Sequence, residues 1–402
     1  MTALRVRHVA DVNPPLPGWD RIPNDAELTF VPLEAVWPRA VDCSRLRPKS
    51  AVSSGYTRFM EGDVVVPKIT PTFEGDRSTW LEKLPTRVAT GTTELHVVRP
   101  GPNVDGRYLD YVFSSRPFLA GGEAEMIGVA GQKRVPDEWL RNFPVPVSAL
   151  AEQRAIADYL DAETARIDAL ITKKQQLIHL LEERWESFRE QELEIGLAEY
   201  SRVALRHVVS ISGGLTLGGS KPTGPTTRRP YLRVANVQDG FLDLDEVVKI
   251  DVPVDAASRF ELREGDVLML EGNGNPANLG RGTIWRGEVE GCLHQNHVHS
   301  VRADPSKIHA EYLNAAVRSP RARSELTGGT GQVSIATLSK SQIGELRVPL
   351  PTLEIQRRVA RTVESERMLL QSLGEAQRQQ IELLAERRRA LVTATVTGKH
   401  AF

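Results

Sequence analysis

The 402-residue sequence has few of the residues that crosslink secreted proteins or anchor proteins in membranes. Its two cysteines, Cys43 and Cys292, lie far apart without metal-ligand spacing, so we expect no disulfide framework. No stretch approaches the roughly 18 consecutive apolar residues that span a bilayer. The opening residues MTALRVRHVADVNPP lack the apolar core of a signal peptide. These absences predict a cytoplasmic protein that makes no membrane contact.

Excess charge of either sign is also missing. The chain carries 51 basic and 52 acidic side chains, which gives a formal net charge of −1. This balance excludes a uniformly basic coat for nucleic acid, but it permits local basic faces. The length suffices for two or three domains that each bury a core.

Signatures of catalysis are scarce as well. Asn13-Pro14-Pro15-Leu16 is similar to the loop with which amino-methyltransferases hold a flipped base, but the aromatic residue of that loop is absent. Gly272-Asn273-Gly274-Asn275-Pro276 lacks both the Lys-Ser/Thr of a phosphate-binding loop and the glycine spacing of a dinucleotide fingerprint. We interpret the first segment as a proline-rich turn. The second is either a plain turn or an Asn/Gly loop on a DNA-facing surface.

A histidine-rich segment, His294-Gln295-Asn296-His297-Val298-His299, is the strongest candidate for metal chemistry. If it forms one strand, we expect its three histidines to share a face, which suits a metal ion or an HNH-type nuclease. No carboxylate cluster accompanies them, so contact with bases or phosphates and a purely structural role both stay open. We predict no metal site and no catalytic site in this chain.

What the sequence does contain is an internal repeat with a period of about 203 residues. Two segments, about 150–197 and 353–395, lack proline and follow proline-containing turns that are typical of helix entries. Shifted by 203 positions, they are identical at 11 of the 36 positions from 153 to 188. At average residue frequencies about two identities would arise by chance. The repeat therefore indicates a duplication.

Apolar residues recur along both segments in steps of three, four or seven. Such a stripe is a heptad-like seam rather than the broad face of a helix lying on a sheet. Thirty-six helical residues form a rod of about 54 Å, which needs a partner of similar length, so we expect the two segments to pair antiparallel. The predicted helix-pairing residues are Ile156, Leu160, Ile167, Leu170, Leu177 and Leu181 in the first segment and Val359, Val363, Leu370, Leu373, Leu384 and Leu391 in the second.

The residues before each helix repeat a common frame in divergent sequence. Glu61-Gly62-Asp63 and Glu264-Gly265-Asp266 recur before an apolar stretch, and we interpret both as turn residues rather than catalytic acids. Short β-branched stretches rich in Gly and Pro predict mixed α/β domains. The predicted fold is therefore α/β (α+β), with two mixed domains, two long antiparallel coiled-coil helices and a pseudo-two-fold repeat. Its expected parts are a first domain (1–149), a central helix (150–197), a second domain (198–352) and a C-terminal helix (353–402).

Basic and polar side chains cluster in the stretches that differ between the copies. Arg and Lys can hold phosphates or guanine edges, and Asn and Gln can read adenine. The candidate DNA contacts are Lys49, Tyr56, Arg58 and Lys68 in the first domain and Lys221, Arg228, Arg229, Arg233, Asn273, Asn275, Arg281, Gln295, Asn296 and His297 in the second.

In this arrangement the whole chain resembles the specificity subunits of type I restriction-modification systems, which carry two variable target-recognition domains, each followed by a long helix. The motifs that carry the resemblance are Leu150-Ala151-Glu152-Gln153-Arg154-Ala155-Ile156-Ala157, Ile167-Asp168-Ala169-Leu170, Leu181-Glu182-Glu183-Arg184, Tyr231-Leu232-Arg233-Val234-Ala235-Asn236-Val237, Glu386-Arg387-Arg388-Arg389-Ala390-Leu391 and Val396-Thr397-Gly398-Lys399.

The resemblance implies a non-catalytic subunit that recognises a bipartite, asymmetric site in double-stranded DNA. It also implies two modification subunits that bind S-adenosylmethionine and methylate adenine, and restriction subunits that use ATP and magnesium. No cofactor is expected in this chain itself. If the helices pair antiparallel, a pseudo-two-fold axis relates the domains, as it relates half-sites in DNA, and helix length sets the spacer between them.

Three alternatives stay open at this point. A structural scaffold with no role in DNA binding is one of them, although its two divergent domains would then lack a purpose. A stand-alone DNA-binding or anti-restriction protein would share the domains but would need no partner surface on its helices. A self-sufficient nuclease or methyltransferase would be active alone with magnesium or S-adenosylmethionine.

Overall fold

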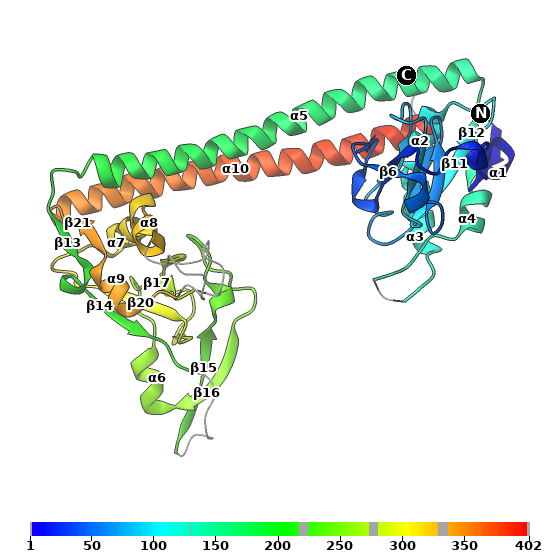
Figure 1. Cartoon of the computed structure of the whole chain (residues 1–402). Helices are drawn as coiled ribbons and strands as arrows, with labels where there is room; N and C mark the ends of the chain where they lie inside the picture. Colours follow the sequence, from blue (N-terminus) through cyan, green and yellow to red (C-terminus); the bar gives the residue numbers. More distant parts are fainter. Residues whose placement is uncertain (1, 130, 217–223, 273–279, 329–336, 400–402) are drawn as a thin grey trace. The chain divides into compact units, whose positions relative to one another are not determined.

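The computed structural model describes residues 2–129, 131–216, 224–272, 280–328 and 337–399. The chain forms two compact units: unit 1 comprises residues 1–175 and 377–402, and unit 2 comprises residues 176–376. Each unit combines one globular domain with part of each of two long helices (Figure 1). The predicted fold class, mixed α/β domains with two long helices, is confirmed.

The two long helices are α5 (Leu150–Glu190) and α10 (Leu353–Val396). A π-helical turn, η4 (Gln191–Ile195), prolongs α5. In unit 1, Lys174 donates a hydrogen bond to Gln377 and Arg388 pairs with Asp168 at 3.1 Å. Position numbers thus fall along α5 as they rise along α10, which confirms the antiparallel pairing in this unit.

In unit 2 the same two helices pair again. Arg184 of α5 forms an ion pair with Glu366 of α10 at 2.9 Å. Beyond it, Leu193 of η4 lies in one hydrophobic cluster with Val359 and Val363. The order along the two helices is again opposite, so the pairing is antiparallel here too.

The helix seam differs in part from the predicted one. Ile156, Leu160, Ile167, Val359, Val363 and Leu370 are buried, whereas Leu181, Leu384 and Leu391 are half-buried. Leu170, Leu177 and Leu373 are 47%, 42% and 42% exposed, so they lie at the edge of the seam. Ile171 and Ile178 are less exposed than these leucines. The correction follows from helix geometry, because 3.6 residues per turn rotates a heptad stripe out of line over many turns.

The domain of unit 1 contains three small sheets, ordered β6-β3-β10-β7, β2-β11-β8-β9 and β1-β12, and a β4-β5 hairpin. Its elements are β1 (Thr2–Arg5), α1 (Val6–Val9), β2 (Ala10–Val12), η1 (Trp19–Arg21), β3 (Glu27–Val31), η2 (Leu33–Ala35), β4 (Val36–Trp37), β5 (Ala40–Val41), β6 (Leu46–Pro48), η3 (Lys49–Ala51), β7 (Thr57–Met60), β8 (Val64–Pro67), β9 (Thr79–Trp80), β10 (Val88–Gly91), β11 (Leu95–Pro100), α2 (Gly106–Phe113), α3 (Arg116–Ala124), α4 (Asp137–Asn142) and β12 (Pro144–Val147). β8 is buried throughout, as expected of a β-branched run at an interior sheet position.

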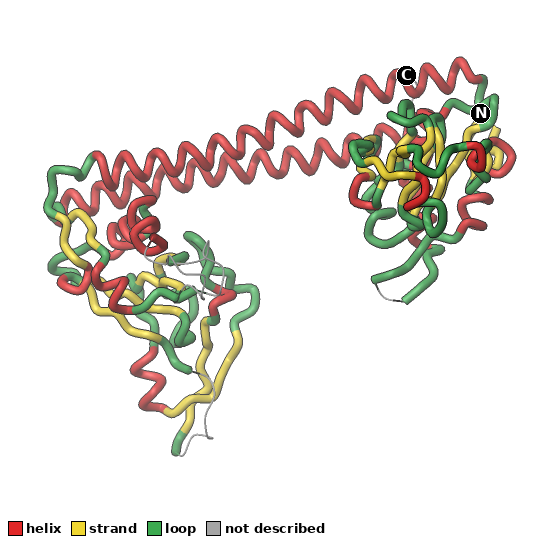
Figure 2. The backbone as a smooth tube through the Cα atoms, viewed as in Figure 1, coloured by secondary structure: helices red, strands yellow, loops and turns green. Residues whose placement is uncertain are grey.

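The domain of unit 2 repeats part of this plan, with sheets ordered β14-β20-β17-β18, β16-β15-β19 and β13-β21. In both domains short strands, short helices and loops alternate, and the long helices lie beside them (Figure 2). The elements are β13 (Arg202–Ala204), η5 (Leu205–His207), β14 (Val209–Gly213), β15 (Thr226–Leu232), η6 (Val234–Asn236), β16 (Val248–Pro253), α6 (Val254–Phe260), β17 (Val267–Leu270), β18 (Gly282–Ile284), β19 (Leu293–His294), β20 (Val298–Ala303), α7 (Ala310–Val317), α8 (Pro320–Gly328), α9 (Lys340–Glu345) and β21 (Arg347–Pro349).

Strand register shows that the repeat extends through the domains. Val97 of β11 is opposite Val65 of β8, and Ser300 of β20 is opposite Leu268 of β17. Each of these residues lies 203 positions from its counterpart. The four-stranded sheets β2-β11-β8-β9 and β14-β20-β17-β18 are therefore the same structure in two copies.

A set of buried polar contacts is also duplicated. Asp63 binds Arg99 through two hydrogen bonds, and Asp266 binds Arg302 in the same way. Each aspartate also accepts a backbone hydrogen bond from the residue three positions before it, which closes the turn. The interpretation of both Glu-Gly-Asp segments as turns is confirmed. We call these paired contacts, together with the equivalent buried residues Gln153 and Gln356, the repeated frame.

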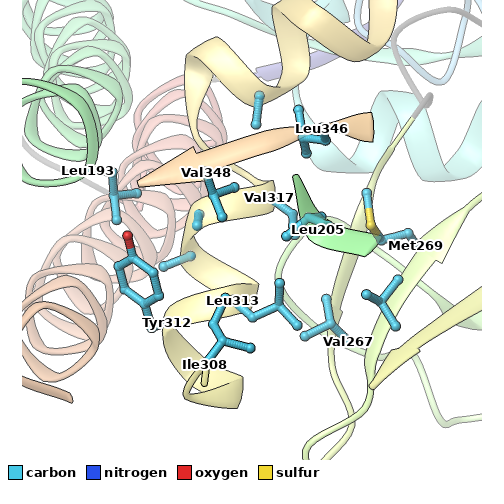
Figure 3. Close-up of a cluster of buried hydrophobic side chains, with 14 of the residues drawn as sticks. Leu193, Leu205, Val267, Met269, Ile308, Tyr312, Leu313, Val317, Leu346 and Val348 are labelled. Carbon is cyan, nitrogen blue, oxygen red and sulfur yellow. The ribbon is translucent and has the colours of Figure 1, made fainter. Parts of the chain in front are cut away.

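The core of each domain extends onto the helix ends. Figure 3 shows Leu205, Val267 and Met269 of unit 2 lying together with Val317 of α7. Leu193 of η4 belongs to the same cluster. Burial of one such side chain contributes about 1.5–3 kcal/mol. The helices start at the predicted positions 150 and 353, but because of this shared core the compact units divide the chain within the helices.

Candidate nucleic-acid interface

An open hollow lies at the same place in the repeated sheet of each unit. Hollow 1, in unit 1, has a volume of about 470 Å³, and its lining includes Asn13, Tyr56, Arg58 and Lys68 with Leu95 and Val97 behind them. Hollow 2, in unit 2, has a volume of about 650 Å³, and its lining includes Ser212, Arg259, Phe260, Glu271, Asn296, His299 and Lys340.

Equivalent positions line the two hollows with different residues. Lys68 corresponds to Glu271 and Tyr56 to Arg259 in the 203-residue repeat. The neighbouring strands β2 and β14 do not follow the 203-residue spacing, so their equivalence is given by their pairing: Val12 is opposite Val98, and Ile211 is opposite Val301. The residues that follow, Asn13 and Ser212, are therefore equivalent as well. None of these matched lining positions has the same residue in both copies, whereas the residues of the repeated frame are the same.

We call the matched positions of Lys68 and Glu271 the central position of each hollow. Equivalent backbone hydrogen bonds hold both of them. The Lys68 amide donates to the Glu94 carbonyl at 2.9 Å, and the Lys68 carbonyl accepts from Val135 at 2.8 Å. In the other copy the Glu271 amide donates to His297 at 2.9 Å, and the Glu271 carbonyl accepts from Leu338 at 2.6 Å. The two side chains therefore leave the backbone at equivalent points.

Aromatic contacts hold the cationic side of hollow 1. The Arg58 guanidinium lies 4.2 Å from the centre of the Trp19 ring and donates to the Ser53 carbonyl. Tyr56 meets Phe30 edge-on at 5.3 Å. These contacts hold the guanidinium against the Trp19 ring in the lining of hollow 1.

Asn13 has a structural role in the same hollow. It adopts a left-handed backbone conformation (φ 53°), its Oδ1 accepts from the Val97 amide, and its Nδ2 donates to Asp137. A hydrogen bond from His96 lowers the pKa of Asp137 to about 2, so this carboxylate stays ionised. These contacts are consistent with the interpretation of the Asn-Pro-Pro segment as a turn.

The expectation that His294, His297 and His299 share one face of a strand is wrong. β19 ends at His294, a turn carries His297, and β20 begins at Val298. His294 and His299 are buried and hydrogen-bonded to the backbone carbonyls of Val298 and Leu338, and burial lowers the pKa of both imidazoles. Only His297 of the three is exposed; it contacts Glu271 at 2.7 Å.

No three His, Cys, Asp or Glu side chains gather into a possible metal site in the part of the chain that the structure describes. Within the same residues, every helix is too short or too polar to cross a bilayer. Cys43 and Cys292 are both free thiols, and burial raises the pKa of Cys292 to about 12.

The remaining predicted contacts divide by position. Tyr56, Arg58 and Lys68 line hollow 1, Asn296 lines hollow 2, and His297 contacts Glu271 of hollow 2. Lys49 is 6% exposed and donates to the Ile22 carbonyl, so its ammonium group lies in the interior rather than on a DNA-facing surface. The structure does not bring the others into either hollow: Arg228 is exposed on β15, Arg229 pairs with Glu261, Arg233 pairs with Glu246, Gln295 accepts from the Val234 amide, and Arg281 is half-buried. Lys221, Asn273 and Asn275 lie outside the described residues.

Sequence reasoning missed several residues of hollow 2. Arg259, Glu271 and Lys340 are separated along the chain and belong to no motif. The available signal was the repeat itself, because shifting Tyr56 and Lys68 by its period points to Arg259 and Glu271.

Comparison with known proteins identifies relatives of the chain. No family model matches it. Its sequence is 37% identical over 151 residues to the type I restriction enzyme EcoAI specificity subunit of Escherichia coli, a match that covers 37% of this chain and 25% of that protein. It is 34% identical over 156 residues to the EcoEI specificity subunit of Escherichia coli, covering 38% and 26%. The match thus spans about a quarter of the length of each of these two relatives.

Solved structures resemble the chain over nearly its whole length. A chain from a structure on complex assembly and conformational transition of the type I R-M system aligns with a TM-score of 0.78 at 16% identity, covering 98% of this chain and 97% of that one. The HsdS subunit from Thermoanaerobacter tengcongensis aligns with a TM-score of 0.57 at 16% identity, covering 99% and 97%. At this identity the likeness establishes the fold. Together with the sequence relatives, it confirms the predicted resemblance to the specificity subunits of type I restriction-modification systems.

Proposed function

We propose that this chain is the DNA-reading subunit of a type I restriction-modification complex and recognises a bipartite, asymmetric site. One observation carries the proposal: the repeated frame is the same in both copies, whereas the matched positions that line the two hollows differ. A protein with one ligand would have no reason to change only the lining. Two domains with one scaffold and two linings suit a site whose halves differ in sequence.

The charge distribution fits a subunit that does not act alone. With a formal net charge of −1, the chain has little general attraction for phosphate. In the proposed complex, two modification subunits supply much of the contact with the DNA backbone, and S-adenosylmethionine, ATP and magnesium belong to partner subunits. The chain itself contributes base recognition and no catalytic step.

Exposed leucines on the long helices support partner docking. Leu180 of α5 and Leu383 of α10 are 57% and 63% exposed, and they occupy equivalent positions of the repeat. Two equivalent surfaces match two modification subunits.

The test is to co-express the chain with a modification subunit and map adenine methylation across DNA by long-read sequencing. The proposed function predicts a single motif in two unlike halves, separated by a fixed spacer. No complex and no methylation, with the partner active beside its own specificity subunit, would favour the stand-alone alternative. Activity of the purified chain alone with S-adenosylmethionine or magnesium would contradict a non-catalytic role.

A further inference from the structure

Hollows 1 and 2 differ in charge at their central position. Lys68 stands in the first where Glu271 stands in the second, and equivalent backbone hydrogen bonds hold both residues. An ammonium group offers hydrogen-bond donors only, whereas a carboxylate offers acceptors only. The scaffold is therefore unchanged while the chemistry that it presents is inverted.

A second reversal accompanies the first. Asp137 is the first residue of α4 and accepts a hydrogen bond from Asn13, which lines hollow 1. Its counterpart in the repeat, Lys340, is the first residue of α9 and lines hollow 2. At both pairs of matched positions, a basic residue in one copy therefore stands where an acidic residue stands in the other.

Both central side chains have capacity for a ligand. The Lys68 ammonium makes no ion pair or hydrogen bond with the described residues; the neighbouring Glu94 instead accepts two 2.8 Å bonds from Arg134. One Glu271 oxygen, Oε2, contacts His297, and no hydrogen bond to Oε1 occurs within the described ranges. Lys68 is half-exposed, and the Glu271 side chain is 27% exposed.

Base edges in the major groove match these two groups. Guanine presents the acceptors O6 and N7, and cytosine presents its N4 amino group as a donor. We propose that Lys68 reads a guanine in one half-site and that Glu271 reads a cytosine amino group in the other. This inference rests on the proposed function and adds the class of base that each hollow contacts.

The test uses the whole complex and compares five variants by methylation mapping. Lys68→Met and Glu271→Met remove the two central groups, and Lys83→Met and Glu264→Met are matched controls at exposed positions outside the hollows. Lys68→Met is expected to lose selectivity at one guanine of one half-site by roughly 5- to 150-fold. Glu271→Met is expected to lose it at one cytosine of the other half-site, and the controls are expected to keep the wild-type motif.

The unaltered half-site reports on folding in each variant, and Lys68→Arg, which keeps the donors, should retain the guanine. Methylation that weakens equally at every sequence would indicate a phosphate contact and overturn the inference. So would variants that keep the wild-type motif, or a loss of selectivity at another base. If the wild-type complex yields no split motif, the proposed function itself fails, which is a distinguishable result.

Discussion

Gln153 and Gln356 hold the start of each long helix against its domain. The Gln356 amide accepts from the His309 backbone N–H at 2.7 Å and donates to the carbonyls of Lys307 and Pro351. Gln153 makes the same three contacts, to Asp105, Asn103 and Ser148. Both glutamines are fully buried. Each buried amide thus engages three backbone groups at the start of its helix, which ties the helix to its domain.

Replacing Gln356 by leucine should therefore destabilise unit 2. The change leaves one N–H and two carbonyl groups without partners, at a cost of about 2–4 kcal/mol in the free energy of unfolding. The measurement is the urea unfolding midpoint beside that of Gln379→Leu, a matched change at an exposed position of α10. Equal midpoints for the two variants would contradict the role assigned to Gln356.

The burial of Asp76 is expected to make the stability of unit 1 depend on pH. Burial raises its pKa to about 7, whereas an aspartate in an unfolded chain has a pKa near 4. The stability that the protonated group contributes is therefore fully present below about pH 4, falls as pH rises and is lost by about pH 7.

The expected contribution of Asp76 is a loss of about 3 kcal/mol of stability between pH 5 and pH 8, which Asp76→Asn should remove. Asparagine tolerates the left-handed backbone at this position (φ 53°). Thermal unfolding of both proteins at the two pH values checks this. An unchanged pH dependence in the variant would assign the effect to other groups.

The two long helices contact each other at positions that are equivalent in the 203-residue repeat. Lys174 of α5 and Gln377 of α10 are 203 residues apart, and they form a hydrogen bond with each other at 3.1 Å. A polar contact within an apolar seam penalises shifted pairings, so it fixes the register of the two helices. Fixed register is what a spacer of constant length requires.

Lengthening both helices should widen the DNA spacer in the proposed complex. Seven residues inserted after Gln175 and seven after Ala376 keep the heptad pattern and add about 10.5 Å to each helix. At 3.4 Å per base pair, the methylated motif should gain about three base pairs of spacer. An insertion in α5 alone should mispair the helices and lower the unfolding temperature. A spacer that stays constant after the double insertion would exclude the helices as its determinant.

The division of the chain into two units predicts that each domain recognises its half-site independently of the other domain. Because each unit has its own core and its own hollow, a change in one domain should leave the other domain's specificity intact. Replacing residues 198–352 by the corresponding domain of another specificity subunit should change one half of the methylated motif. Methylation mapping of the chimaera and its parent provides the comparison, and a change in both halves would argue against separate recognition.

Sequence alone determined the architecture of this protein. The 203-residue repeat, the proline-free segments and the apolar stripe predicted two mixed domains and two antiparallel helices, because periodicity and duplication are properties of the chain itself. It also separated the turn residues Asp63 and Asp266 from catalytic acids, since both recur in the same context.

Tertiary structure alone decided which side chains share a site. Glu271, Arg259 and Lys340 come together only because strands and helices distant in sequence meet at one sheet edge. It also assigned Lys49 and His299 to the interior, where backbone carbonyls engage their polar atoms. Residue type predicts what a group can bind, but burial and neighbours decide whether it is available, and those depend on long-range packing.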